Sequence, residues 1–223
     1  MATILCIETA TTNCSVALSV NGSVIALQED NPQNKEGKKF SHAEKLHTYI
    51  GNVLDKASIS KNEIDAIAVS KGPGSYTGLR IGVSAAKGLC YSLDVPLIAV
   101  STLQSLAMQV NDNSTIVTML DARRMEVYSA IFSSNKELLR ETEAQIIDEN
   151  SFETYLSLGN VTFIGDGVAK FKEICNHPNA IYRQDSLPSA KEMAQLAETK
   201  HKKNDTVDVA YFEPYYLKDF IAN

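Results

Sequence analysis

The sequence lacks the simplest signatures of a redox, metal or membrane protein. Its four cysteines, Cys6, Cys14, Cys90 and Cys175, form no Cys-x-x-Cys pair, and the first three lie in apolar or small-residue patterns. This predicts reduced, mostly buried thiols in a cytosolic protein. No run approaches the ~18 consecutive apolar residues that a membrane span needs. The first ten residues also lack the charged n-region of a signal peptide, so we expect a cytoplasmic protein with no membrane association.

An excess of positive charge is also missing. The formal net charge of the 223 residues is −6. An acidic chain is a poor candidate for binding nucleic acid alone, because neutralisation of phosphates by lysine and arginine supplies most of the non-specific affinity. Two short basic runs, at 35–39 and 200–203, are interpreted as solvated surface rather than RNA contacts.

Residue patterns that would support a metal or a nucleophile are absent too. His42 and His47 are five residues apart, which places them roughly 140° apart around a helix instead of on one face as a helical zinc pair requires. Ser75 lies in no G-x-S-x-G motif, and Cys90 falls in an apolar helical pattern typical of an inert thiol. The sequence therefore predicts no metal, no cofactor and no catalytic residue.

Alternating and helical hydrophobic patterns predict an α/β protein. Asn21-Gly22 between two alternating runs is a strong hairpin signal, and Ser41 with Glu44 has the spacing of a helix capping box. The first half is predicted to contain strands at 3–7, 14–20 and 23–29, a helix at 41–57, a strand at 65–70, a helix at 79–93, a strand at 96–100 and a helix from 102 to about 110.

The order of elements then partly repeats. The second half is predicted to contain strands at 115–122, 126–132 and 137–147, a short helix near 151–157, a strand at 161–165, a helix at 168–175 and a last helix with Ser189 and Glu192 as its capping box. Glu8 and Asp121 end matching strands. Two βββαβα units suggest the duplicated actin-like fold (ASKHA, or ribonuclease H-like), with a first lobe at 1–106 and a reduced second lobe at 107–223, whose tail is able to pack back on the first.

The segment "KGPGSYTGLRIG" at 71–82 has the composition of a phosphate-binding loop. Its glycines permit unusual backbone conformations, Ser75 and Thr77 add hydroxyls, and the segment leads from a strand into a helix, whose N-terminus favours anions. By itself such a loop is weak evidence for a nucleotide site.

Five segments together resemble the bacterial TsaB (YeaZ) family. They are "ILCIETATTNCSVALS", "SHAEKL", "GPGSYTGLRIGVSAAKGL", "LDARRMEVYSAIF" and "EPYYL", and the resemblance extends over nearly the whole chain. It implies a non-catalytic subunit that binds and activates a TsaD-type catalytic subunit in the formation of threonylcarbamoyladenosine on tRNA, beside the anticodon. It further implies a TsaE-type ATPase as a partner and contact with tRNA only through the complex. Whether the isolated chain forms a homodimer is left open.

Two other functions are weighed against this one. An actin-like ATP-binding enzyme would need Asp-x-Gly after its first strand, where this chain has Glu8-Thr9-Ala10, and a side chain there obstructs phosphate. A glycoprotease-like metallopeptidase would need a pair of metal-ligating residues on one helix face, which the sequence does not provide. We expect at most a vestigial anion or nucleotide site, formed by Glu8, Thr9, Thr11, Gly72, Gly74, Ser75 and Asp121.

The helix predicted at 79–93 is apolar on two sides. One stripe contains Leu79 and Val83, and the other contains Ile81 and Leu89, so both sides need a cover. The residues alone leave open whether another helix of the chain or a partner covers the second stripe. The family resemblance favours a partner. The residues predicted to form this interface are His42, Leu46, Tyr49, Ile81, Ala85, Gly88, Leu89 and Ser92.

Overall fold

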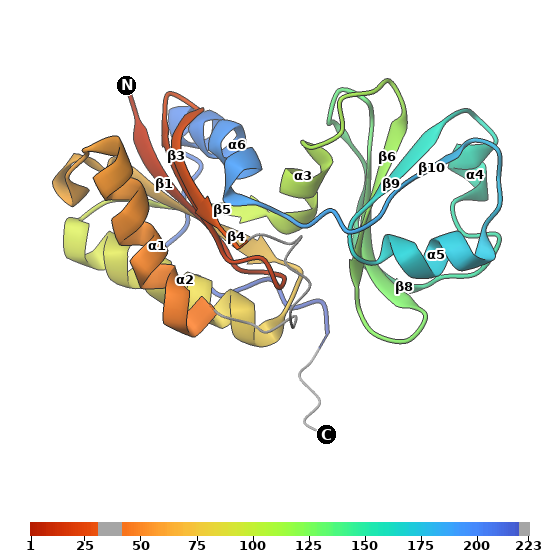
Figure 1. The fold of residues 1–223 in the computed structure, drawn as a ribbon, viewed down its shortest axis with the longest axis horizontal. Helices are drawn as coiled ribbons and strands as arrows, with labels where there is room; N and C mark the ends of the chain where they lie inside the picture. The colour runs from red at the N-terminus through yellow and green to blue at the C-terminus, as the bar shows by residue number, and fades with distance from the viewer. Residues whose placement is uncertain (31–41, 219–223) are drawn as a thin grey trace. The chain divides into compact units, whose positions relative to one another are not determined.

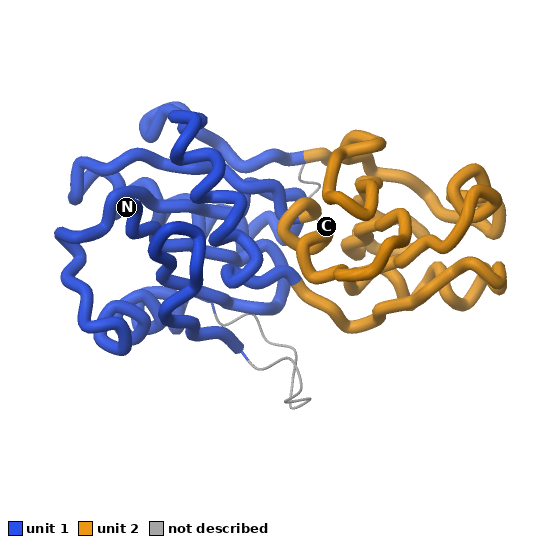
Figure 2. Tube along the Cα trace, turned by 90° about the horizontal axis from the view of Figure 1, so that it is seen from above, with its two compact units in different colours: residues 1–102, 188–216 blue, residues 103–187, 217–223 orange. Residues whose placement is uncertain are grey.

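The computed structural model describes residues 1–30 and 42–218, and these form two compact units (Figure 2). Unit 1 comprises Met1–Thr102 and Pro188–Tyr216, and unit 2 comprises Leu103–Leu187 followed by Leu217 and Lys218. The predicted boundary after residue 106 stays a prediction. The segment Pro188–Tyr216 belongs to the tail that was expected to be able to pack back on the first lobe, and it is part of unit 1. Ser41 and the basic run at 35–39 lie outside the described residues.

Unit 1 is built on a five-stranded sheet in the order β3-β2-β1-β4-β5. The strands β1, β4 and β5 run parallel, and β2 and β3 form the predicted hairpin, in which Asn21 and Gly22 both have positive φ. Its elements are β1 (Thr3–Glu8), β2 (Ser15–Val20), β3 (Ser23–Glu29), α1 (His42–Ala57), the 3-10 turn η1 (Lys61–Glu63), β4 (Ala66–Gly72), α2 (Tyr76–Leu93), β5 (Leu97–Ser101) and α6 (Ala190–Lys202).

Unit 2 repeats this sheet in the order β8-β7-β6-β9-β10, with β6, β9 and β10 parallel. The predicted duplication is therefore confirmed, and Glu8 and Asp121 do end the matching strands β1 and β6. The prediction missed β10, whose four residues are half-buried or exposed and so lack a strong apolar pattern. The elements are α3 (Thr102–Ala107, which begins at the boundary), β6 (Thr115–Asp121), β7 (Glu126–Phe132), β8 (Leu138–Ile146), α4 (Glu153–Leu156), β9 (Val161–Ile164), α5 (Val168–Ile174) and β10 (Ala180–Arg183).

Alternate side chains of β1 belong to two different cores. Leu5 and Ile7 lie in the cluster beneath α1 and α2, and Ile4 and Cys6 lie in the cluster on the other face of the sheet, beneath α6. This alternation follows from the two-residue repeat of a strand. Figure 1 shows α1 and α2 on one side of the sheet and α6 on the other. Because both faces are covered, β1 reads as a continuous apolar run instead of an alternating one.

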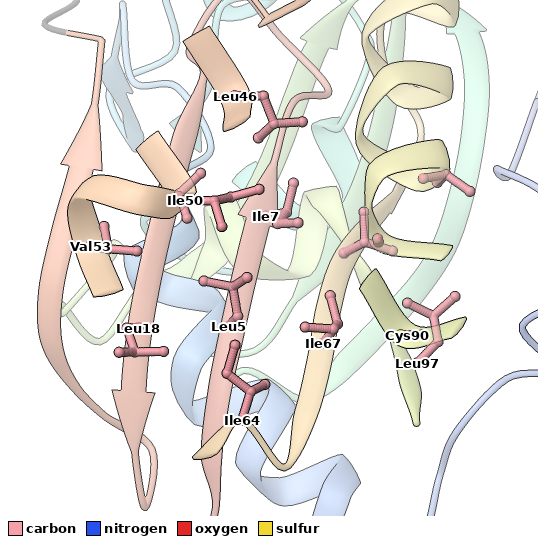
Figure 3. Close-up of a cluster of buried hydrophobic side chains, with 14 of the residues drawn as sticks. Leu5, Ile7, Leu18, Leu46, Ile50, Val53, Ile64, Ile67, Cys90 and Leu97 are labelled. Atoms are coloured by element: carbon pink, nitrogen blue, oxygen red, sulfur yellow. The ribbon is translucent and has the colours of Figure 1, made fainter. Parts of the chain in front are cut away.

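Helix α1 anchors the first of these cores through three buried side chains, Leu46, Ile50 and Val53 (Figure 3). They recur at the three- and four-residue spacing of one helix face. Burial of each such side chain stabilises the fold by roughly 1.5–3 kcal/mol. The stripe on α2 that contains Leu79 and Val83 is also buried, so this is the stripe that faces the sheet.

Unit 2 has a core of aromatic rings on one face of its sheet. Phe152, Phe163 and Phe171 lie with ring centroids 4.8–5.6 Å apart, within the range where aromatic pairs attract. On the opposite face, Leu103 and Leu106 of α3 belong to the buried cluster. The helix that follows β5 thus packs in unit 2, and the helix that follows β10 packs in unit 1.

Helix starts were predicted less accurately than helix positions. Helix α2 begins at Tyr76, three residues before the predicted start, because Ser75 is its N-cap and accepts a hydrogen bond from the Gly78 N–H. At α6 the Ser189 hydroxyl caps the helix by accepting from the Lys191 N–H, while the predicted reciprocal bond from Glu192 is absent from the cap. Glycine and serine near a helix start leave this boundary ambiguous in sequence.

All four cysteines are free and buried, as predicted. Burial raises the pKa of the Cys6 thiol to about 12, so it stays protonated and unreactive at neutral pH. Within 1–30 and 42–218, no helix has both the length and the apolar content to cross a bilayer.

Candidate functional site

The glycine loop that leads into α2 is filled by the chain itself. A Cβ on Gly74 would lie 2.4 Å from the carbonyl oxygen of Ala10, a distance that side chains do not tolerate. The N–H of Ser75 donates to that same carbonyl at 2.7 Å. The segment after β1 therefore occupies the place where a phosphate would approach the loop, and one of the loop's amides is already used.

The first turns of α2 are pressed against Thr9 in the same way. A Cβ on Gly78 would come within 2.2 Å of the Thr9 carbonyl oxygen, and a Cβ on Gly82 within 2.2 Å of the Thr9 hydroxyl oxygen. That hydroxyl donates to the Gly78 carbonyl at 2.9 Å. Glycine at 78 permits the close approach of the Thr9 backbone, and glycine at 82 makes room for the Thr9 side chain, which explains the pattern without a ligand.

Glu8, at the end of β1, is a fully buried carboxyl group. Its Oε1 accepts a hydrogen bond of 2.6 Å from the Ala10 N–H, and its Oε2 has no hydrogen-bond partner among the described residues. Burial raises the pKa of this carboxyl to about 7, although the Ala10 hydrogen bond works in the opposite direction. Burial therefore favours the neutral form of Glu8, which is a poor ligand for a metal ion.

Three other members of the predicted vestigial site, Thr11, Gly72 and Asp121, are in contact with other residues of the chain. The Thr11 carbonyl accepts a hydrogen bond of 2.7 Å from Nε2 of His42. Gly72, with φ of +108°, lies where a Cβ would come within 2.9 Å of the Tyr215 carbonyl oxygen. Asp121 belongs to unit 2, where its exposed carboxylate accepts from the Lys170 ammonium at 2.9 Å. The idea of a residual nucleotide site that joins Asp121 to the unit 1 residues stays a prediction.

A groove of about 710 Å³ lies between α1 and α2. Four residues of the second apolar stripe of α2 line it, and three of them are half-buried, with Gly88 exposed. These residues are Ile81, Ala85, Gly88 and Leu89. Among the described residues, no helix of unit 1 covers this stripe, which forms one wall of an open groove.

Two residues predicted for the partner interface lie in the interior instead. Leu46 packs in the core under α1, and the imidazole of His42 is buried against the loop after β1, where burial also lowers its pKa. The family resemblance implied only that the helix at 41–57 takes part in the interface, and it did not distinguish the buried side chains of this helix from the exposed ones. Tyr49 is half-buried, and its hydroxyl donates to Asp30 at 2.8 Å. Ser92 is exposed but is not among the residues that line the groove.

Sequence reasoning also missed residues of the groove. The α1 wall is formed by Ala43 and His47, and the α2 wall extends to Tyr76, Arg80 and Ser84. Ala43 and His47 are four residues apart and therefore share a helix face. Neither residue is strongly apolar, so the apolar pattern of the sequence does not mark this face.

Comparison with known proteins shows which family the chain belongs to. Residues 36–223 match the family model described as "TsaD: tRNA N6-adenosine threonylcarbamoyltransferase". The chain is 32% identical over 228 residues to the tRNA threonylcarbamoyladenosine biosynthesis protein TsaB of Escherichia coli (strain K12), and the match covers 98% of this chain and 96% of that protein. The chain belongs to the TsaB (YeaZ) family.

Solved structures support the same assignment for this TsaB-family chain. A Pseudomonas aeruginosa protein described as similar to peptidase YeaZ superposes with a TM-score of 0.84 at 26% identity, covering 98% of this chain and 100% of that one. Component A of (R)-2-hydroxyglutaryl-CoA dehydratase from Acidaminococcus fermentans gives a TM-score of 0.50 at 11% identity, covering 92% and 100% of the two chains. At that identity only the fold is shared, and it is the duplicated actin-like α/β fold predicted from the sequence.

Proposed function

We propose that this TsaB-family chain is a non-catalytic subunit that binds and activates a TsaD-type threonylcarbamoyltransferase in the modification of tRNA adenosine. The observation that carries the proposal is the open groove between α1 and α2. Its α2 wall includes the half-buried apolar side chains of Ile81, Ala85 and Leu89, which no helix within residues 1–30, 42–102 and 188–216 covers. Apolar surface of this kind, rimmed by polar residues, marks protein interaction sites.

The shape of the groove suits a partner helix. Ala85 and Gly88 carry almost no side chain, so a second helix can approach the α2 backbone closely between Ile81 and Leu89. Interlocking of such small and large residues is how helices pack. The likeness of this chain to the TsaD family model suggests that the partner presents a related pair of helices.

The filled glycine loop supports a non-catalytic role. Ala10 and Thr9 occupy the space beside Gly74 and Gly78, and Glu8 holds its charge poorly because it is buried. An actin-like ATPase in its own right would need that space for phosphate and an ionised carboxylate for a metal. We therefore retain ATP binding by the isolated chain only as the alternative, and calorimetry with Mg-ATP tests it.

The remaining partners of the complex are inferred from the family. We expect a TsaE-type ATPase to join the pair and tRNA to be the substrate of the assembly. The Escherichia coli relative is named as a tRNA threonylcarbamoyladenosine biosynthesis protein, which agrees with a tRNA substrate. In the absence of the catalytic subunit, the same groove is the surface through which two copies of this chain would form a homodimer.

The test of the groove is the variant Ala85→Glu. A carboxylate placed in a packed apolar interface has no partner and costs several kcal/mol, so size-exclusion chromatography with the TsaD-type subunit should show no complex. Tyr91→Glu adds the same charge to the same helix at a residue that is 88% exposed and outside the groove, and it should pair normally. Normal pairing by Ala85→Glu would contradict the proposal.

A third variant checks the orientation of α2. Ala86 is fully buried toward the sheet, so Ala86→Glu should unfold unit 1, as seen by thermal melting, whereas Ala85→Glu should melt close to the wild type. If both variants unfold, α2 is needed internally on both sides and the groove is not a free interface.

A further inference from the structure

A third side of α2, between its two apolar stripes, presents aromatic and basic side chains. Tyr76, Arg80, Lys87 and Tyr91 follow one another at spacings of four, seven and four residues, which places them along one line of the helix. Tyr91 is 88% exposed. This line is separate from both apolar stripes.

The C-terminal segment of unit 1 runs beside this line and is tied to it. The Lys87 ammonium donates to the carbonyl oxygens of Ala210 and Phe212, at 2.9 and 3.1 Å. The Tyr215 N–H donates to the Lys71 carbonyl at 2.7 Å. The segment is therefore a fixed wall of unit 1, and it contributes further exposed rings.

Between helix and segment lies a hollow of about 370 Å³. The rings of Tyr76 and Tyr216 meet at its edge with centroids 5.0 Å apart, and the Arg80 guanidinium lies 5.1 Å from the Tyr76 ring. Its lining residues are Tyr76, Arg80, Val83, Ser84, Lys87, Phe212, Glu213, Pro214 and Tyr216. Two cations and one carboxylate thus line the hollow, together with aromatic surfaces and the hydroxyls of Tyr76, Ser84 and Tyr216.

We propose that this hollow and the rings around it bind an unstacked, single-stranded stretch of RNA. An aromatic ring offers a stacking face to any base, and arginine or lysine beside it offers charge to the phosphate, which is how proteins hold single strands. The hollow has the size of a small-molecule pocket, which suits one nucleotide unit.

Features outside the hollow favour an RNA strand over a free nucleotide. Tyr211, 84% exposed, directly follows Ala210, whose carbonyl is tied to Lys87, and Tyr91 lies one helical turn beyond Lys87. On the other side, the Lys71 ammonium lies 5.9 Å above the Tyr215 ring. A single nucleotide would leave these groups unused, whereas a strand of several nucleotides would reach them.

The inference rests on the proposed function for the identity of the RNA as tRNA, but not for the chemistry of the patch. It departs from the expectation that the chain contacts tRNA only through the complex, because the aromatic and basic side chains of the patch lie on this chain. Tyr76, Arg80 and Ser84 line both this hollow and the groove between α1 and α2, so RNA bound here would lie next to the proposed catalytic partner. Because the whole chain is acidic, with a net charge of −6, we expect binding that is specific to the patch and sensitive to salt.

The test measures RNA binding by the full chain alone, so that it does not depend on the partner. Fluorescence anisotropy with a labelled single-stranded RNA of about ten nucleotides compares the wild type with Tyr216→Leu and Tyr216→Phe. Tyr216 lines the hollow but not the partner groove. Loss of a stacking ring should weaken binding about fivefold or more, while Tyr216→Phe keeps the ring and should bind like the wild type.

A charge variant and a competitor complete the design. Lys71→Gln should reduce the slope of log affinity against log salt by about 0.7. Absence of RNA binding by the wild type, or equal binding by Tyr216→Leu, would overturn the inference. Competition by AMP at concentrations as low as those of the RNA would show a free-nucleotide site instead, which also overturns it. Pairing of the same variants with the TsaD-type subunit, followed by size-exclusion chromatography, reports separately on the proposed function.

Discussion

The Thr9 hydroxyl donates a hydrogen bond of 2.9 Å to the Gly78 carbonyl, and the Thr9 carbonyl lies only 2.2 Å from where a Cβ on Gly78 would be. The loop after β1 and the first turn of α2 therefore touch through backbone. Gly78→Ala should destabilise the protein by about 1–3 kcal/mol, the usual cost of overpacking, as measured by urea unfolding.

Gly88 provides the matched control on the same helix. A Cβ there would meet nothing within 4 Å, so Gly88→Ala should stabilise the chain by up to about 1 kcal/mol through helix propensity. Equal behaviour of the two alanine variants would mean that the close contact with Thr9 is not needed for folding.

The raised pKa of the Glu8 carboxyl predicts that the stability of the protein depends on pH. Its folded-state pKa of about 7 lies above the ordinary value of 4.5, so between these values the folded state binds more protons than the unfolded state. The contribution of protonated Glu8 to the free energy of unfolding is fully present below pH 4.5, and it is lost as the pH rises through 7. Glu8→Gln, which resembles the protonated acid, should remove this loss, and at pH 8 it should be more stable than the wild type by on the order of 3 kcal/mol.

Urea unfolding at pH 5 and pH 8 separates this effect from general stabilisation. The difference in the free energy of unfolding between Glu8→Gln and the wild type should grow with pH, because only the wild type has a carboxyl to ionise in the buried site. A difference that is the same at both pH values would contradict the raised pKa.

Lys87 should control the attachment of the segment at 208–216. Lys87→Met keeps the apolar stem but removes two hydrogen bonds to backbone carbonyls, each worth roughly 1 kcal/mol. Limited chymotrypsin digestion at Tyr211 and Phe212 should then proceed about fivefold faster or more. Lys56→Met, which removes a single bond from α1 to Gln28, should leave that cleavage unchanged.

The sequence predicted the fold because its signals were local and repeated. The Asn21-Gly22 hairpin, the apolar runs of the parallel strands and the two stripes of α2 each reflect backbone geometry that a single chain segment determines. The sequence allowed the tail to pack back on the first lobe but did not require it, because nothing in residues 190–202 records which sheet the apolar face of α6 meets.

The candidate site was predicted less well, for a related reason. The glycines at 74, 78 and 82 indicate only that something approaches the backbone closely. A phosphate and the residues Thr9 and Ala10 satisfy that requirement equally in sequence, and only the structure shows that the chain itself fills the space. Likewise His42 and Ala43 are neighbours in sequence, and the direction of the helix alone makes one buried and the other exposed.

Helix α6 follows unit 2 in the sequence but packs in unit 1. This arrangement sets the order in which the two units can be completed during synthesis. The sheet of unit 1 has all its strands once β5 has left the ribosome, but the face that carries Ile4 and Cys6 stays uncovered until α6 emerges, nearly a hundred residues later. A ribosome that stalls in unit 2 would therefore present an open apolar sheet to chaperones and proteases, and a fragment that ends before residue 188 would be a target for degradation rather than a working half.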